Sequence, residues 1–275
     1  MPTKEYPVIW FQGAACSGCA VSILNALSPT IKNVLLDELV PGKHINLLFM
    51  PTIMTASGKS AMDVIVDTEK SHKGEYIFIV EGSIPENGFG DVGDEPMEDI
   101  VERLAKNAFA VVALGTCSAF GGIPGGSPNP TKARSVKELL NQKNISVPLI
   151  NIPGCPTHPD WFVGTVANLL IFGIPELDEL QRPKLFFGQL IHENCERRAY
   201  FDKGKFASKL SDEGCLFEVG CKGPYTHADC AIRSWNSGVN WCVQNGGPCI
   251  GCVEPEFPDL QAMYSKATFD KQYEF

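Results

Sequence analysis

The chain has no hydrophobic run long enough to cross a membrane. Its longest apolar stretch, residues 166–174, includes Asn168, whereas a spanning helix needs about 20 apolar residues. It also has no run of Lys and Arg, and its net charge of −9 disfavours binding to nucleic acid. The start of the chain carries Lys4 and Glu5 and shows no signal-peptide pattern. We therefore expect no transmembrane segment and no nucleic-acid partner.

Signatures of hydrolytic and nucleotide chemistry are absent as well. No arrangement of Ser, His and Asp resembles a catalytic triad. The run 57–60 (SGKS) imitates the end of a P-loop, but the glycine that the motif needs five residues before Gly58 is replaced by Ile53. Histidine is scarce, with five residues in 275. Cysteine is not: there are eleven, and an odd number argues against a pure disulfide framework.

The cysteines and one histidine supply twelve candidate iron ligands. His192 stands three residues before Cys195 and completes three groups of four, the number of protein ligands that a four-iron cluster takes. Structural zinc and disulfides remain alternatives, although most zinc sites pair two C-x-x-C knuckles at short separation. The candidates are Cys16, Cys19, Cys117, Cys155, His192, Cys195, Cys215, Cys221, Cys230, Cys242, Cys249 and Cys252.

Residues 1–178 alternate between strand-like and helix-like patterns. Apolar runs suited to buried parallel strands lie at 8–11, 45–50, 76–80, 110–114 and 148–152. Helical patterns lie between and after them, at 21–27, 59–68, 96–107, 135–143 and 161–172, the last capped by Thr157 or Asp160. This alternation predicts an α/β fold with a flavodoxin-like, doubly wound parallel sheet.

Cysteines closely follow three of the predicted strands. Cys16 and Cys19 come after the first strand, Cys117 after the fourth and Cys155 after the fifth. Ligands bind at the carboxyl ends of such strands, so we expect the four thiols to meet at one site. Glu81 ends a further strand beside it, where its carboxylate would tune the site, relay a proton or satisfy loop amides.

A boundary is indicated between Pro175 and Pro183, which flank an acidic stretch. We place a first domain at 1–178 and a second, smaller domain at 179–275. The second domain holds eight of the twelve candidates and has little regular pattern. We expect it to be largely irregular and to fold around its metals, whose binding energy substitutes for a core.

Several motifs, in order and over nearly the whole length, resemble the small subunit of nickel–iron hydrogenases. The resemblance implies an electron-transfer subunit of a heterodimer, in which a separate large subunit splits dihydrogen at a nickel–iron centre and no catalytic residue lies in this chain. It also implies an external carrier such as a multihaem cytochrome c or a ferredoxin, and a periplasmic location with the leader missing from this chain; the cytoplasm is the alternative. The matching runs are 10–19 (WFQGAACSGC), 81–85 (EGSIP), 115–124 (GTCSAFGGIP), 153–156 (PGCP), 192–195 (HENC), 220–224 (GCKGP) and 248–252 (PCIGC).

The resemblance also groups the ligands into three [4Fe–4S] clusters. Cys242 stands where the commonest members have proline and a [3Fe–4S] medial cluster; a cysteine there is similar to the nickel–iron–selenium branch. The medial cluster would be [3Fe–4S] if Cys242 were not a ligand. The implied sets are Cys16, Cys19, Cys117 and Cys155 (proximal); His192, Cys195, Cys215 and Cys221 (distal); Cys230, Cys242, Cys249 and Cys252 (medial).

Two other electron-transfer assignments compete with this one. The small subunit of quinone-reducing respiratory complexes has one cluster on a similar domain, but it lacks a cysteine-rich tail such as the eight candidates after residue 184. A ferredoxin-like subunit of a formate or carbon monoxide enzyme is disfavoured by the doubly wound first domain.

Overall fold

The computed structural model describes residues 3–258. The chain divides into two compact units, Met1–Leu185 and Phe186–Phe275. The predicted domain boundaries at 178 and 179 stay a proposal, and residues 259–275 of the predicted second domain lie outside the described residues. Within residues 3–258, no helix has the length and apolar character needed to cross a membrane.

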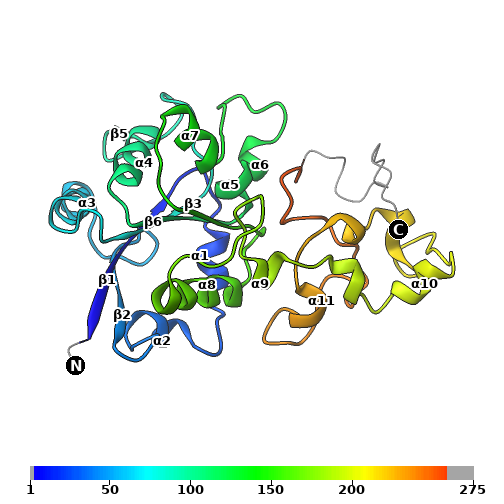
Figure 1. The fold of residues 1–275 in the computed structure, drawn as a ribbon. Coiled ribbons are helices and arrows are strands. Elements are labelled where there is room, and N and C mark those ends of the chain that lie inside the picture. The colour runs from blue at the N-terminus through cyan, green and yellow to red at the C-terminus, as the bar shows by residue number, and fades with distance from the viewer. Residues whose placement is uncertain (1–2, 259–275) are drawn as a thin grey trace. The chain divides into compact units, whose positions relative to one another are not determined.

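A five-stranded parallel sheet forms the centre of the first unit (Figure 1). Its order, β2-β1-β3-β6-β7, runs outward in both directions from β1, which is the doubly wound order of flavodoxin-like folds. The predicted fold class is confirmed. The strands are β1 (Lys4–Gln12), β2 (Lys43–Phe49), β3 (Ile77–Glu81), β6 (Ala110–Leu114) and β7 (Leu149–Ile152); β4 (Asp91–Val92) and β5 (Glu95–Pro96) form a separate antiparallel pair.

Helices cover both faces of the sheet (Figure 1). One face is covered by α1 (Gly18–Ile23), α2 (Ile31–Leu35) and α8 (Pro159–Phe172). The other is covered by α3 (Lys59–Ser71), α4 (Met97–Lys106), α5 (Thr116–Phe120) and α7 (Val136–Gln142), and the short α6 (Gly122–Gly125) follows α5.

Alternation along the strands produces these two layers, because successive side chains of a strand point to opposite faces. Ile9 and Phe11 belong to the buried core shared with α3, α4 and α7. Val8 and Trp10, one residue earlier in each case, line an apolar cavity of about 30 Å³ beside α1, α2 and α8. Burial on both faces explains why the strand segments are continuously apolar.

Two helix starts show how far the sequence patterns reach. The helical pattern predicted at 135–143 contains α7, and Ser135 caps this helix with its side chain and with a capping box. The cap of α8 was predicted wrongly: His158 Nδ1, and not Thr157 or Asp160, accepts the first free N–H, that of Asp160, at 3.1 Å. The predicted helix 21–27 is also displaced, since α1 begins at Gly18 and ends at Ile23.

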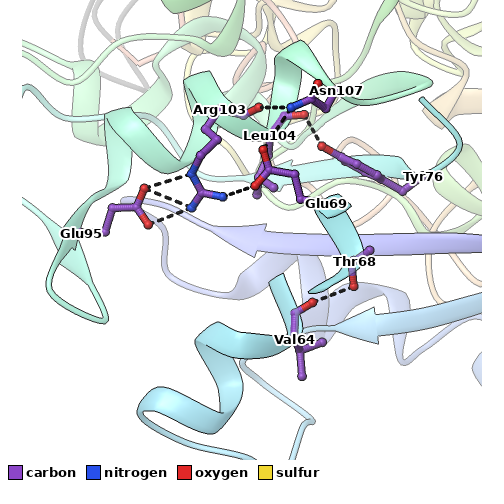
Figure 2. A network of polar contacts seen from close by, with 8 residues as sticks. All are labelled: Val64, Thr68, Glu69, Tyr76, Glu95, Arg103, Leu104 and Asn107. Carbon is purple, nitrogen blue, oxygen red and sulfur yellow. Dashed lines mark hydrogen bonds and ion pairs between the residues drawn. The ribbon is translucent and has the colours of Figure 1, made fainter. Parts of the chain in front are cut away.

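A polar network joins α3, α4 and the β4–β5 pair (Figure 2). Arg103 of α4 donates to Glu95 through Nε at 3.2 Å and Nη2 at 2.8 Å, and it also pairs with Glu69 of α3. Tyr76 Oη donates to the Leu104 carbonyl at 2.5 Å. Tyr76 immediately precedes β3, so the network lies at the amino edge of the sheet, away from the carboxyl ends of the strands.

The described residues of the second unit contain short helices and isolated bridges, and no strand of more than one residue. The longest helix within residues 186–258, α10, has five residues. This agrees with the irregular structure expected after the boundary. The helix α9 (Lys184–Phe187) spans the boundary between the units, and the elements after it are η1 (Ile191–Asn194), α10 (Arg198–Asp202), η2 (Leu216–Val219), η3 (Gly223–Tyr225) and α11 (Cys230–Arg233).

Candidate metal centres

The ends of four parallel strands form one row at the carboxyl edge of the sheet. Gln12 pairs with Glu81, Glu81 with Leu114, and Leu114 with Ile152. The loops that follow β1, β6 and β7 therefore start beside one another, although they are far apart in sequence. All four predicted proximal ligands follow these ends.

Hydrogen bonds tie these loops together. Thr116 N–H donates to the Gly154 carbonyl at 3.0 Å, and Gly154 N–H donates in return to Thr116 Oγ1 at 2.8 Å. Ser22 Oγ of α1 donates to the Thr157 carbonyl at 2.8 Å. These bonds fix the Cys117 segment and α1, which carries Cys19, relative to the loop after β7.

The structure brings the four proximal candidates together. Burial raises the pKa of Cys19 far above its usual range, the backbone N–H of Thr157 lowers it, and Cys117 and Cys155 raise it further. Burial likewise raises the pKa of Cys117 to about 11, with contributions from Cys155 and Cys16. No disulfide joins any of the eleven cysteines. Crowded, desolvated thiols hold their protons until a metal displaces them, so this donor set fits a thiolate-bound cluster.

Glu81 is the buried polar centre of this edge, with 1% of its surface exposed. Its Oε2 accepts from Trp10 Nε1 at 2.9 Å and from Gln12 Nε2 at 3.1 Å, and its Oε1 accepts from Ala20 N–H at 3.1 Å. The donors are an indole, a side-chain amide and a backbone N–H in the first turn of α1, so the predicted role of satisfying loop amides is not what these contacts show. The tuning and proton-relay roles stay predictions. The carboxylate connects β1 and β3 to the first turn of α1, which includes Cys19.

Gly115 allows the closest approach to a proximal candidate. Its backbone has φ +85° and ψ 159°, a region that is essentially restricted to glycine. A Cβ atom at this position would lie 2.5 Å from Cys19 Sγ. The loop after β6 therefore requires glycine both for its backbone conformation and for space beside the thiol.

In the second unit, one cavity is lined by all four predicted distal ligands: His192, Cys195, Cys215 and Cys221. Burial raises the pKa of Cys195 to about 11, while the N–H of Arg197, 3.4 Å from Cys195 Sγ, lowers it. The structure thus gathers one imidazole and three thiols around one space.

The burial and hydrogen bonding of His192 are those expected of a metal ligand at this cavity. Its side chain is 6% exposed, and its Nε2 atom has no hydrogen-bond partner among residues 3–258. A buried nitrogen without a partner is costly. Burial also lowers the pKa of His192, which favours the neutral imidazole that binds metals. The orphaned nitrogen therefore fits a ligand role.

The four medial candidates are close to one another in the same unit. Burial raises the pKa of Cys230 well above its usual range, and the thiols of Cys252 and Cys242 raise it further. Burial also raises the pKa of Cys249, with contributions from Cys221 and Cys252. Cys242, the residue that distinguishes the two medial alternatives, lies at the surface.

The spacing of these side chains differs from that of a single-ion site. Within the described part of the chain, no three His, Cys, Asp or Glu side chains converge on the position of one metal ion. A four-iron cluster needs a wider arrangement, because each ligand binds a different iron.

The sequence did not single out several residues that contact candidate ligands without being ligands themselves, among them Arg197, Lys222 and Thr226. For two of these three, closeness in sequence to a ligand was an available signal: Arg197 is two residues after Cys195, and Lys222 follows Cys221 directly. Nothing in the sequence marked Lys222 as buried.

The two halves of the chain match two family models. Residues 16–169 match the family described as NADH ubiquinone oxidoreductase, 20 kDa subunit. Residues 187–265 match the family described as the C-terminal part of the NiFe/NiFeSe hydrogenase small subunit. The first match corresponds to the respiratory alternative. The second covers the segment that this alternative lacks.

Curated relatives and solved structures match both halves together. The chain is 45% identical to the periplasmic [NiFeSe] hydrogenase small subunit of Desulfomicrobium baculatum, over 93% of this chain and 85% of that protein. It is 40% identical to the periplasmic [NiFe] hydrogenase small subunit of Solidesulfovibrio fructosivorans, over 96% and 83% of the two chains. A crystal structure of the reduced, active Ni-Fe-Se hydrogenase from Desulfomicrobium baculatum matches with a TM-score of 0.88 and 43% identity, over 96% of this chain and all of that chain. The recombinant [NiFeSe] hydrogenase from Desulfovibrio vulgaris Hildenborough matches with a TM-score of 0.88 and 40% identity, over 96% and 98%. The chain therefore belongs to the family of nickel–iron hydrogenase small subunits.

Proposed function

We propose that this chain is the electron-transfer subunit of a nickel–iron hydrogenase, most similar to the nickel–iron–selenium branch. It relays electrons between a nickel–iron centre in a large subunit and an external redox partner, during reversible oxidation of H2 and reduction of protons. The observation that carries the proposal is the row of strand ends that gathers Cys16, Cys19, Cys117 and Cys155, in a chain 45% identical to a [NiFeSe] hydrogenase small subunit.

Each of the three ligand groups is assigned to one [4Fe–4S] cluster. When bound, such clusters supply one-electron redox couples whose potentials depend on ligand type, burial and hydrogen bonds to sulfur. The proximal ligands are Cys16, Cys19, Cys117 and Cys155; the distal ligands are His192, Cys195, Cys215 and Cys221; the medial ligands are Cys230, Cys242, Cys249 and Cys252.

The chain's own contribution is to hold, desolvate and polarise these ligands. The backbone N–H groups of Arg197 and Cys249 point at thiols of the distal group, at 3.4 Å from Cys195 Sγ and 3.3 Å from Cys221 Sγ. Such donors stabilise negative charge on sulfur and so favour an added electron. His192 is neutral where the other ligands are thiolates, which further lowers the negative charge of the distal group.

Cys242 determines the type of the medial cluster. Its thiol raises the pKa of Cys230, as that of Cys252 does, and it also raises the pKa of the distal candidate Cys221. With a fourth thiolate, the medial site holds four irons and not three, and its potential lies nearer those of its neighbours. This favours operation in both directions.

The assembly proposed for the chain includes a large subunit and an external electron carrier, such as a multihaem cytochrome c or a ferredoxin. The compartment is the periplasm, as in the names of two relatives; the cytoplasm is the alternative. An obligate interface with the large subunit should exceed about 2,000 Å² of buried surface.

Co-expression with a nickel–iron hydrogenase large subunit tests the proposal. The complex should reduce a viologen dye with H2 as the donor, and neither chain alone should do so. The respiratory alternative predicts instead a complex that reduces quinone and is inactive with H2. H2 oxidation by this chain alone would contradict the assignment of catalysis to another subunit.

A further inference from the structure

Lys222 lies between ligand segments of two different groups. It follows Cys221, a distal candidate, and its own N–H donates to the carbonyl of Cys249, a medial candidate, at 2.7 Å. The N–H of Cys249 in turn donates to Cys221 Sγ at 3.3 Å. The main-chain N–H of the medial candidate Cys249 therefore contacts the sulfur of the distal candidate Cys221, and this contact connects the two groups.

The side chain of Lys222 is buried, with 8% of the residue exposed. A Cβ atom built on Gly251 would lie 3.5 Å from both Cβ and Cδ of Lys222, so the lysine stem packs on the loop that carries Cys249 and Cys252. The Nζ atom lies 3.5 Å from the Gly220 carbonyl, just before Cys221.

The positive charge of the buried Lys222 ammonium group can be compensated by the neighbouring sulfurs. A buried cation is stable only near negative charge or with its hydrogen bonds satisfied. Burial lowers the pKa of Lys222, and the sulfurs of Cys249 and Cys221 oppose this shift. The residue is next to Cys221 in sequence and is hydrogen-bonded to the Cys249 carbonyl, so it adjoins one ligand of each group.

We propose that Lys222 is a shared electrostatic residue of the distal and medial sites, placed so that its positive charge favours an added electron at both. The inference rests on the proposed function, since it requires clusters at the two sites. In electron transfer along the chain, one site loses an electron and the other gains it. A charge close to both sites favours the reduced form of each and need not favour one over the other. Lys222 therefore raises both potentials and leaves the difference between them nearly unchanged, and the Cys249 N–H to Cys221 Sγ contact is the short connection between the two sites.

A packing role alone makes a different prediction. The aliphatic stem of Lys222 covers Gly251 whatever the charge at its end. A substitution that keeps an aliphatic stem and removes the ammonium group therefore separates the electrostatic role from the packing role. Lys222→Met does this, and Lys222→Arg keeps the charge. Lys209→Met is the matched control, because the Lys209 side chain is 74% exposed.

The test is a redox titration of the purified heterodimer, followed by electron paramagnetic resonance. In Lys222→Met, the reduced-to-oxidised ratio at a fixed potential should fall at least tenfold at the distal and medial sites, which is a shift of about 59 mV or more for a one-electron couple. Lys222→Arg and Lys209→Met should leave both ratios within about threefold of wild type, and the proximal site should not change in any variant.

Unchanged potentials in Lys222→Met, or equal shifts in Lys222→Met and Lys222→Arg, would overturn the inference and leave a packing role. If Lys222→Met does not assemble, Lys222→Gln carries the same comparison. Iron content and the wild-type spectrum show whether the proposed function or only the role of Lys222 has failed. A wild-type complex without three clusters contradicts the proposed function. A wild-type complex with three clusters, whose potentials do not change in Lys222→Met, contradicts only the role of Lys222.

Discussion

Gly115→Ala should remove the proximal cluster while leaving the other two in place. The new methyl group would lie 2.5 Å from Cys19 Sγ, and ordinary contact begins at 3.4 Å. The sulfur or the loop must therefore shift by about 0.9 Å, whereas metal–ligand distances tolerate only about 0.2 Å. The backbone at φ +85° and ψ 159° adds about 1–3 kcal/mol of strain.

Gly173→Ala is the matched control for this strain. Gly173 ends α8 with φ +87° and ψ −158°, in the same glycine-restricted region, but nothing lies within 4 Å of its Cβ position. Both variants should lose about 1–3 kcal/mol of stability. Only Gly115→Ala should also displace a candidate ligand.

Iron analysis and chemical unfolding of the purified heterodimer measure the two effects. By cluster stoichiometry we expect about eight irons per small subunit in Gly115→Ala and about twelve in Gly173→Ala, with similar losses of unfolding free energy from strain. A full iron content in Gly115→Ala, with unchanged resonance signals of the proximal cluster, would refute the placement of Cys19 at that cluster. Equal iron loss in both variants would assign the effect to strain alone.

Three further substitutions test separate parts of the structure. Cys242→Pro should convert the medial cluster to a three-iron form, because proline offers no donor atom, and should raise its potential; identical iron content and resonance spectra before and after the change would show that Cys242 binds no iron. Glu81→Gln should lower the free energy of unfolding, measured in urea, by about 1–3 kcal/mol, because the amide N–H2 of the new glutamine would face buried N–H donors. A loss no larger than that of the exposed control Glu75→Gln would contradict this. Arg103→Met should cost about 1 kcal/mol and leave the iron content at the wild-type value, since its partners lie at the amino edge of the sheet (Figure 2); loss of iron would contradict that separation.

The strands could be predicted from the sequence because each is a continuous apolar run. The run 110–114 coincides with β6, and the other four predicted runs overlap their strands with ends that differ by a few residues. Short helices could not be found in this way: α5 has five residues and α6 has four, which is too short for a 3.6-residue period. The cap of α8 was predicted wrongly because imidazole is an uncommon capping group, whereas the side chains of Thr and Asp are common ones.

The convergence of Cys16, Cys19, Cys117 and Cys155 followed from strand order alone, because parallel strands deliver their carboxyl ends to one edge. The surroundings of the ligands could not be predicted. The donors to Glu81 come from residues 61 to 71 positions away, and their positions depend on how the loops pack. The burial of Lys222 depends in the same way on the segment around Gly251, which the sequence order does not reveal.

The proposed function requires this chain to hold three four-iron clusters. The most direct measurement is the iron and acid-labile sulfide content of the active heterodimer, per small subunit and corrected for the metals of the large subunit. We predict about twelve irons and twelve sulfides, with broad brown absorption. Close to four or eight irons in a fully active complex, or zinc without this absorption, would contradict the account.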